Sequence, residues 1–341
     1  MRIGLTYDLK DAVKGGLSSE GLPEDALEEY DSLETVKGIA AAIESKGHST
    51  VLLGGGRDFL NNIQKEKVDL VFNIAEGLGN YRSREAQIPS ILEMLGIPYT
   101  GSDPLALAVS LDKDVTKRLV SLNGIATPKW HIIRSLEELA SADWHGFRFP
   151  LFVKPLHEGS SKGIRNISKI DRLEQVNTII TTLIERYHQE VIVEEFIYGE
   201  EITTGVIGNP PQVLGIMRVV PRRPDPDFVY SLEVKRDWEN LVDYECPARL
   251  NTDTLKRISE AAIKVFNTLG CRDISRVDFR IGTDGIPYFL EINPLPGLNP
   301  RSGDIVIMSG KMGWTYPALI SAIVDAAVKR YGREPQSRHH S

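Results

Sequence analysis

The stretch from Ile274 to Asn293 constrains the fold more than any other part of this chain. Asp284 and Gly285 separate two runs of alternating apolar and polar residues, and this pattern predicts a β-hairpin with a two-residue type I′ turn. In the register that such a turn sets, Phe279 lies opposite Leu290. One face of the hairpin is then continuously apolar and is expected to lie in a core.

The other face of the predicted hairpin carries two acids. Asp278 lies opposite Glu291, and Arg276 lies opposite Asn293, in the same register. Like charges directly opposite each other are destabilising, so the pair favours a bound cation. Mg²⁺ fits because it prefers hard oxygen ligands and is commonly shared between carboxylates and substrate phosphates. The alternative is a solvated polar face on which Arg276 and Arg280 neutralise the acids.

Length, charge and cysteine content indicate an ordinary intracellular protein. The chain has 341 residues, enough for two or three domains, and a formal net charge of −7, which argues against nucleic-acid binding. No apolar run is long enough to span a bilayer, and the N-terminus becomes polar too soon for a signal peptide. The two cysteines, Cys246 and Cys271, predict no disulfide framework, so a cytoplasmic location is expected. His339 and His340 lie in a polar tail.

The order of predicted elements divides the chain into three units and a tail. Residues 1–108 alternate strands and helices, which predicts a parallel α/β sheet. Residues 109–190 and 191–333 read as two further α/β or α+β units, and residues 334–341 as a flexible tail. The glycines at 54–56 lack the spacing of a dinucleotide fingerprint and are expected to form a loop. A capping box of Asp31 and Glu34 is predicted to begin a helix.

Several residues could bind phosphate groups. The loop from Glu158 to Gly163 follows an apolar strand that ends near Lys154, and glycine, serine and lysine in such a loop suit an anion. A buried lysine without an anion is costly. The alternative for the loop is an ordinary hairpin turn. Lys113 lies on a predicted helix, and residues 221–247 form a long loop with Lys235 at its centre, which is expected to be functional.

Together these features predict a site for ATP with Mg²⁺. Cations and backbone amides hold phosphate oxygens, and metal ions neutralise them during phosphoryl transfer. The chain has no Walker A motif, kinase signature, GxSxG, CxxC or HExxH that would indicate another class of enzyme.

The motifs resemble those of the D-alanine–D-alanine ligase branch of the ATP-grasp superfamily. The similarity covers roughly residues 70 to 330, and the matches occur in the family's order. They are Ile97-Pro98-Tyr99-Thr100-Gly101, Leu111-Asp112-Lys113, Val153-Lys154-Pro155 with Glu158-Gly159-Ser160-Ser161 and Gly163, Val193-Glu194-Glu195-Phe196, Ser275-Arg276-Val277-Asp278, and Leu290-Glu291-Ile292-Asn293 with Pro296-Gly297. The resemblance implies an ATP-grasp fold behind an N-terminal parallel α/β domain. It also implies ligation through an acyl phosphate, with release of ADP and phosphate.

The resemblance implies a role for each matching residue. Binding of ATP is implied for Lys113, Lys154, Glu158, Gly159, Ser160, Ser161, Gly163, Glu194, Glu195, Phe196, Ile197, Glu201, Phe279 and Leu290. Two Mg²⁺ ions, with Mn²⁺ as an alternative, are implied at Asp278, Glu291 and Asn293. Catalytic roles are implied for Arg276, Lys235, Gly297 and Ser160, and substrate binding for Ser302. Because many family members are dimers, the resemblance also allows a homodimer.

The chain departs from the family on the amino-acid side. Glu76 stands where the family has a histidine, and Arg236 where it has a tyrosine after the loop lysine. Glu76 could accept a substrate ammonium, and Arg236 or Arg301 could pair with an extra carboxylate. The functional hypotheses are therefore a ligase forming a D-Ala-D-Ala-like dipeptide, a ligase of the same mechanism for another amino-acid pair, and a nucleotide-binding module without ligase activity.

Overall fold

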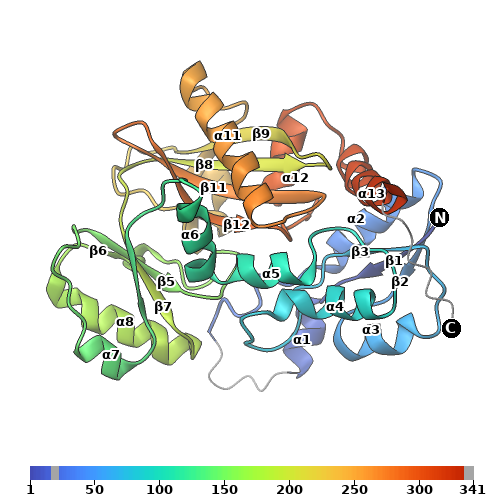
Figure 1. Cartoon of the computed structure of the whole chain (residues 1–341), viewed down its shortest axis with the longest axis horizontal. Helices are drawn as coiled ribbons and strands as arrows, with labels where there is room; N and C mark the ends of the chain where they lie inside the picture. Colours follow the sequence, from blue (N-terminus) through green and yellow to red (C-terminus); the bar gives the residue numbers. More distant parts are fainter. Residues whose placement is uncertain (17–22, 334–341) are drawn as a thin grey trace.

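Within the described residues the strands form three sheets. The computed structural model describes residues 1–16 and 23–333, and the predicted tail with His339 and His340 lies outside the described residues. Figure 1 shows the three sheets side by side, with helices on their outer faces and the N-terminus next to the first sheet.

The first sheet is the predicted parallel α/β unit. Its strands are β1 (Arg2–Thr6), β2 (Ser49–Leu52) and β3 (Leu70–Asn73), with β1 in the middle and both pairings parallel. The helices around it are α1 (Lys10–Gly16), α2 (Leu33–Glu44), α3 (Gly56–Ile63), α4 (Gln87–Met94) and, from the C-terminus, α13 (Tyr316–Arg333). The predicted cap at Asp31 is wrong, because Ser32 caps α2 by accepting the Thr35 N–H.

The second sheet is antiparallel and contains the strand before the Gly/Ser loop. Its order is β4 (Trp130–Ile133), β7 (Val191–Glu195), β5 (Leu151–Pro155) and β6 (Lys169–Ile170). Helices α7 (Leu136–Ala140) and α8 (Leu173–Tyr187) cover one face, and α5 (Pro104–Leu111) and α6 (Lys113–Leu122) lead into it. Since β7 pairs with β5, the predicted boundary between residues 190 and 191 falls inside the chain segment that builds this sheet.

The third sheet carries the predicted hairpin. Its antiparallel order is β10 (Val242–Glu245), β9 (Gln212–Pro221), β8 (Gly199–Ile207), β11 (Ile274–Gly282) and β12 (Pro287–Asn293). Helix α11 (Thr252–Thr268) buries its apolar side against one face, and α12 (Asp304–Lys311) contacts β8 and β9. The expected long loop at 221–247 instead contains the short helices α9 (Leu232–Arg236) and α10 (Trp238–Leu241) and the edge strand β10.

The hairpin has the predicted pairing at its acids but not at its tip. Asp278 lies opposite Glu291, as expected. The type I′ turn is wrong: Gly285 has a positive φ of 74° and Asp284 does not, and the Gly282 N–H donates to the Ile286 carbonyl around a three-residue loop. Phe279 consequently pairs with Phe289, and a bulge before Glu291 leaves Leu290 unpaired.

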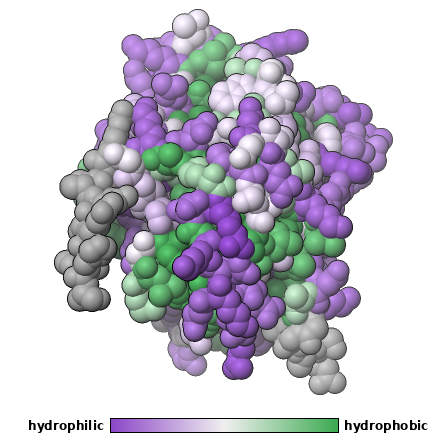
Figure 2. Space-filling model, turned by 90° about the vertical axis from the view of Figure 1, so that its right-hand side faces the viewer, coloured by the Kyte–Doolittle hydropathy of each residue, from purple (hydrophilic) through white to green (hydrophobic). Residues whose placement is uncertain are grey.

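Hydrophobic side chains are mostly enclosed between these layers. The largest cluster joins β1 and β3 to α2, α12 and α13, so the C-terminal helix is packed into the N-terminal unit. On the face shown in Figure 2, a hydrophilic stripe divides the exposed hydrophobic residues of the lower half. No helix in the described part of the chain is long and apolar enough to cross a membrane.

Candidate active site

A small cavity between the second and third sheets is lined by half of the residues expected to bind the nucleotide. This intersheet cavity is lined by Lys154, Glu194, Glu195, Phe196, Ile197, Glu201 and Leu290, together with Pro128, Phe152, Val229 and Arg280. The bulge in β12 explains Leu290, since the side chain leaves the paired register. Lys113 and the residues of the Gly/Ser loop lie outside its lining, and Phe279 is fully buried in the core beneath α11.

The intersheet cavity is nearly closed. Its volume is about 40 Å³, far below the several hundred Å³ of a typical ligand pocket. The Arg280 guanidinium lies over the Phe196 ring at 4.5 Å and donates to Glu201 at 2.8 Å. A nucleotide can enter here only if these side chains and the two sheets move apart.

Two buried lysines meet one buried glutamate beside the intersheet cavity. The Lys154 ammonium lies 3.4 Å from Glu194, and Lys117 lies 2.6 Å from the other oxygen of the same carboxylate. Burial lowers the pKa of Lys117 to about 8, although Glu194 opposes that shift. Sequence reasoning missed Lys117, but its spacing of four residues from Lys113 on one helix face was a usable signal.

The paired acids of the hairpin face the same lysines. Glu291 lies 3.8 Å from Lys154, 4.0 Å from Lys113 and 3.9 Å from Arg276. Burial acts to raise the pKa of Glu291, but these cations outweigh it and hold the pKa at about 2. Burial and Glu291 raise the pKa of Asp278, although Arg276 opposes them. Glu291 therefore lies toward Lys154 and Lys113, and Asp278 lies against Arg276.

The donor set at the acid pair suits a hard cation. Asp278 Oδ1 is buried and has no hydrogen-bond partner among the described residues, while its other oxygen accepts from Arg276 at 3.0 Å. Asn293 Oδ1 already accepts the Leu295 N–H at 3.0 Å. No group of three or more His, Cys, Asp or Glu side chains in residues 1–16 and 23–333 has metal-binding geometry. Two carboxylates and phosphate oxygens nevertheless match Mg²⁺.

Arg276 and Lys235 are held beside the acid pair. Arg276 is 7% exposed and contacts both Asp278 and Asp304, the latter at 3.2 Å. Asp304 begins α12, far from the hairpin in sequence, and sequence reasoning missed it. Lys235 lies over the Tyr230 ring at 5.0 Å, and burial and the nearby Arg276 lower its pKa. The short helix α9 thus places Lys235 near Arg276, Asp278 and Glu291 of the hairpin.

The Gly/Ser loop adopts a strained turn. Ser160 and Ser161 have φ values of 50° and 60°, which serine rarely adopts, and the Lys162 N–H closes the turn onto the Gly159 carbonyl. Such strain is concentrated at functional sites. The Lys113 ammonium donates to the Glu158 carbonyl at 2.5 Å. This bond links the loop to the lysine that faces Glu291.

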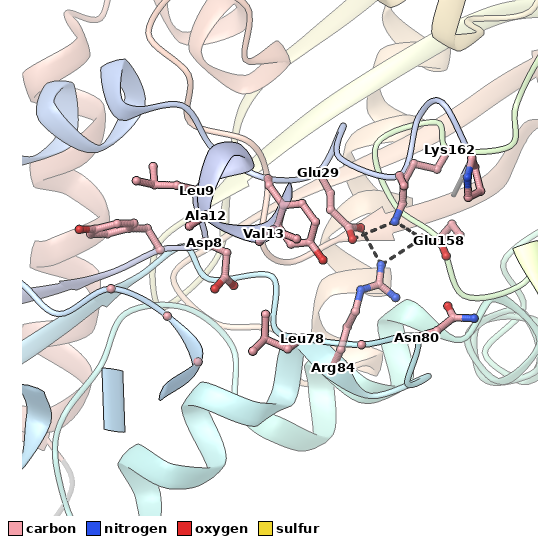
Figure 3. Close-up of a pocket in the computed structure, with 18 of the residues that line it drawn as sticks. Asp8, Leu9, Ala12, Val13, Glu29, Leu78, Asn80, Arg84, Glu158 and Lys162 are labelled. Atoms are coloured by element: carbon pink, nitrogen blue, oxygen red, sulfur yellow. Dashed lines mark hydrogen bonds and ion pairs between the residues drawn. The ribbon is translucent and has the colours of Figure 1, made fainter. Parts of the chain in front are cut away.

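The N-terminal unit meets this loop through a buried ion network. The Arg84 guanidinium lies 2.7 Å from Glu29 and 3.2 Å from Glu158, and the Lys162 ammonium contacts both acids. Asp25 accepts from the Gly163 N–H and the Tyr187 hydroxyl. Figure 3 shows the four charged side chains of the network facing one another.

A much larger cavity, called the N-terminal cavity here, opens beside this network. Its volume is about 800 Å³. Its walls come from the loops after β1, β2 and β3, from α1 and from the Gly/Ser loop (Figure 3). They include Tyr7, Asp8, Leu9, Ala12, Val13, Gly54, Gly55, Gly56, Leu78, Glu29, Arg84, Glu158 and Lys162.

The residues expected to select the amino acids do not line this cavity. Arg236 is exposed and ion-paired with Glu28 at 2.6 Å, and Arg301 is 83% exposed and paired with Glu34. Neither arginine therefore faces a buried substrate carboxylate. Gly297 and Ser302 are exposed, and the Ser302 N–H donates to Asn299. Burial and Glu85 raise the pKa of Glu76 well above its ordinary value.

Comparison with known proteins identifies the family. Residues 119–325 match the family model described as D-ala D-ala ligase C-terminus. A D-alanine–D-alanine ligase of Aquifex aeolicus is 33% identical over 295 residues, which covers 86% of this chain and 94% of the relative.

Solved structures show the same architecture. D-alanine–D-alanine ligase from Bacillus anthracis, in a crystal structure with ATP, superposes with a TM-score of 0.74 at 24% identity, covering 98% of this chain and 99% of that one. The VanG D-Ala:D-Ser ligase from Enterococcus faecalis gives a TM-score of 0.72 at 25% identity, covering 96% and 99%. The expected ATP-grasp architecture is confirmed, and the chain belongs to the D-alanine–D-alanine ligase family.

Proposed function

We propose that this protein is an ATP-dependent carboxylate–amine ligase that forms a dipeptide-like product. The substrate carboxylate oxygen attacks the γ-phosphorus of ATP, and ADP leaves with the electrons of the broken bond. The amine of the second substrate then attacks the acyl carbon, phosphate leaves, and the amine loses a proton to solvent. The family membership and the names of the relatives, which are ligases, support this reaction class.

One structural observation carries the proposal: the lysines of the intersheet cavity and the acids of the hairpin meet at one point. Lys154 contacts Glu194 inside the intersheet cavity and lies 3.8 Å from Glu291 at its edge. A nucleotide in the cavity would therefore place its phosphates between Lys113, Lys154 and the acid pair. Charge stabilisation of this kind is the main protein contribution to phosphoryl transfer.

The proposed roles follow from these positions. Glu194 to Ile197 and Leu290 would contact the adenine, and Glu201 the ribose. The turn of Gly159, Ser160 and Ser161 would cover the β- and γ-phosphates with its backbone N–H groups. Lys235 would contact the transferred phosphoryl group, and Arg276 with the Gly297 amide would stabilise the oxyanion that forms on acyl transfer.

Asp278 and Glu291, with the Asn293 side chain, would hold Mg²⁺. When bound, the ions neutralise phosphate charge and orient the nucleotide. The unpartnered Asp278 oxygen and the facing carboxylates support this assignment. The homodimer and the cytoplasmic location stay predictions.

The amino-acid pair is a separate question from the reaction class. Arg236, which the sequence offered as a partner for an extra carboxylate, is paired with Glu28 instead. The departures from the family at Glu76 and Arg236 are what favour a ligase whose amino-acid pair differs from two D-alanines. A nucleotide-binding module without ligase activity is the remaining alternative.

Release of ADP that depends on an added amino acid tests the proposal. The purified full-length chain with ATP and Mg²⁺ should release ADP when amino acids of either stereochemistry are supplied in pairs, and mass spectrometry should detect one new peptide bond. ADP release that is equal with and without every amino acid or short peptide supplied would contradict a ligase. Nucleotide binding without turnover would favour the binding module.

A further inference from the structure

Asp8 is a buried carboxylate without a cationic partner. It follows β1, is 6% exposed, and lines the N-terminal cavity. Its Oδ2 accepts the Gly77 N–H at 3.0 Å, and Asp8 forms no ion pair with any residue of the described ranges. The charged neighbour that acts on it is another acid, Glu29. A buried acid is rarely left unpaired, because the desolvation of its charge is costly.

The surrounding backbone fixes the position of Asp8. A methyl group at Gly55 would lie 1.9 Å from Asp8 Oδ1, so only glycine allows the loop after β2 to pass so close. Gly77, in the loop after β3, has a positive φ of 83° and donates to the other oxygen. The Asp8 carbonyl accepts the Asp31 N–H at 3.0 Å. The carboxylate is thus held between the loops of all three parallel strands, where α/β sheets bind ligands.

The N-terminal cavity has apolar side chains beside Asp8, and its charged lining comprises Arg57 and Asp58 as well as the ion network. In Figure 3, Asp8 lies between Ala12 and Val13 of α1 on one side and Leu78 on the other. The far end is closed by the ion network of Glu29, Arg84, Glu158 and Lys162, which contains the Gly/Ser loop.

A hydrogen bond through the Gly/Ser loop links the charged end of the cavity to the reaction centre. The Glu158 carbonyl accepts from Lys113, and Lys113 lies 4.0 Å from Glu291. A ligand that reaches from Asp8 to the Gly/Ser loop therefore has one end at an unpaired acid and the other beside the proposed phosphates.

We propose that the N-terminal cavity binds an elongated acyl donor of dipeptide size with a free amino terminus. Its ammonium pairs with Asp8, its apolar side chains lie against Leu9, Val13 and Leu78, and its carboxylate reaches the Gly/Ser loop. The inference rests on the proposed ligase function and names its substrate class. The product is then a tripeptide: the donor's terminal carboxylate takes the γ-phosphoryl group, and an amino acid's amine displaces phosphate from the acyl carbon.

The size of the N-terminal cavity supports a donor larger than one alanine. Its volume of about 800 Å³ lies in the range of roughly 300–1,000 Å³ that accommodates drug-sized ligands. A single alanine, with one methyl side chain, would fill only a small part of this volume.

The experiment compares donors with and without an ammonium group. Leucyl-leucine in its all-L and all-D forms, the N-acetyl derivatives and single alanines are tested as donors, with both alanine enantiomers as acceptors, by ADP release and by mass of the product. We expect kcat/KM for one free dipeptide to exceed that for its N-acetyl form by about tenfold or more, because acetylation removes an ion pair to a buried acid.

Asp8→Asn should abolish the preference for the free amine and leave KM for ATP unchanged. Asp11→Asn is the matched control, since Asp11 is an exposed acid on α1 that does not line the cavity. If Asp8→Asn fails to fold, Ala12→Phe serves instead: a ring at this wall should lower kcat/KM for the dipeptide more than for alanine.

The outcomes separate the two proposals. If single alanine is the better donor, or if free and acetylated dipeptides react equally, the inference about the donor is wrong and the ligase function stands. If these donors do not stimulate ADP release but another amino acid or short peptide does, the inference about the donor is wrong; if none does, the proposed function itself is wrong.

Discussion

The intersheet cavity and the N-terminal cavity differ in how their buried charges are balanced. Beside the intersheet cavity each buried acid meets a cation: Glu194 meets two lysines, and Glu201 meets Arg280. On the N-terminal side, Asp8 and Glu85 are buried and form no ion pair among the described residues. The buried acids of the intersheet cavity are therefore paired with cations of the protein, whereas Asp8 has no cation beside it, and in our proposal a substrate ammonium neutralises it.

The largest expected effect concerns the acids of the hairpin. Glu291→Gln should lower turnover by about 10²–10³-fold, as the loss of a preorganised charge-stabilising group does, and should leave the fold intact by circular dichroism. Glu200→Gln is the control, because Glu200 is an exposed acid on the neighbouring strand β8. Near wild-type turnover in Glu291→Gln would contradict the proposed role of the hairpin acids in binding Mg²⁺.

Arg84 tests whether the N-terminal ion network is as interdependent as its geometry indicates. Arg84→Met leaves Glu29 and Glu158 buried with less positive charge, so the free energy of unfolding should fall by about 3–5 kcal/mol. Urea denaturation measures this change. Arg118→Met, which removes an exposed pair with Asp114, should change it by less than about 1 kcal/mol. Equal effects of the two substitutions would contradict the role of the network.

Glu85 on the N-terminal side is expected to make the free energy of unfolding depend on pH. Burial raises the pKa of Glu85 from 4.5 to about 7, although Arg84 opposes the shift. Between these two values the folded chain holds a proton that the unfolded chain releases, so this residue makes the protein less stable as pH rises through the window. Glu85→Gln should remove that loss, and urea denaturation at about pH 5 and about pH 8 should show a smaller decline than in wild type. If Glu85→Gln loses as much stability between these two pH values as the wild type does, Glu85 is not the residue responsible.

The smallest effect is expected at Arg301. Its guanidinium is 83% exposed and lies 2.9 Å from the exposed Glu34, and such surface pairs contribute about 0–1 kcal/mol. Arg301→Ala should therefore leave both the unfolding free energy and the KM values for the amino acids nearly unchanged. A large increase in one KM would restore the substrate role that the sequence suggested.

Local pattern indicated the strands that carry the nucleotide side, and long-range charge pairing sets the contacts that no local pattern shows. The alternation around the hairpin is visible in the sequence, and both of its strands form. Arg236 and Arg301 pair with acids more than two hundred residues away, at Glu28 and Glu34, which no local pattern indicates. Helices α9 and α10 are too short to show periodicity. The sequence gives no sign of the role proposed for Asp8, because its burial without a cation arises only when the loops after β1, β2 and β3 come together.

The bulge at Leu290 makes the tip of the hairpin independent of its acids. A two-residue turn without a bulge and a three-residue turn with one both bring Asp278 opposite Glu291, and this chain uses the second arrangement. A change of one residue in the length of the tip can therefore be absorbed by the bulge before it alters the pairing of the two acids.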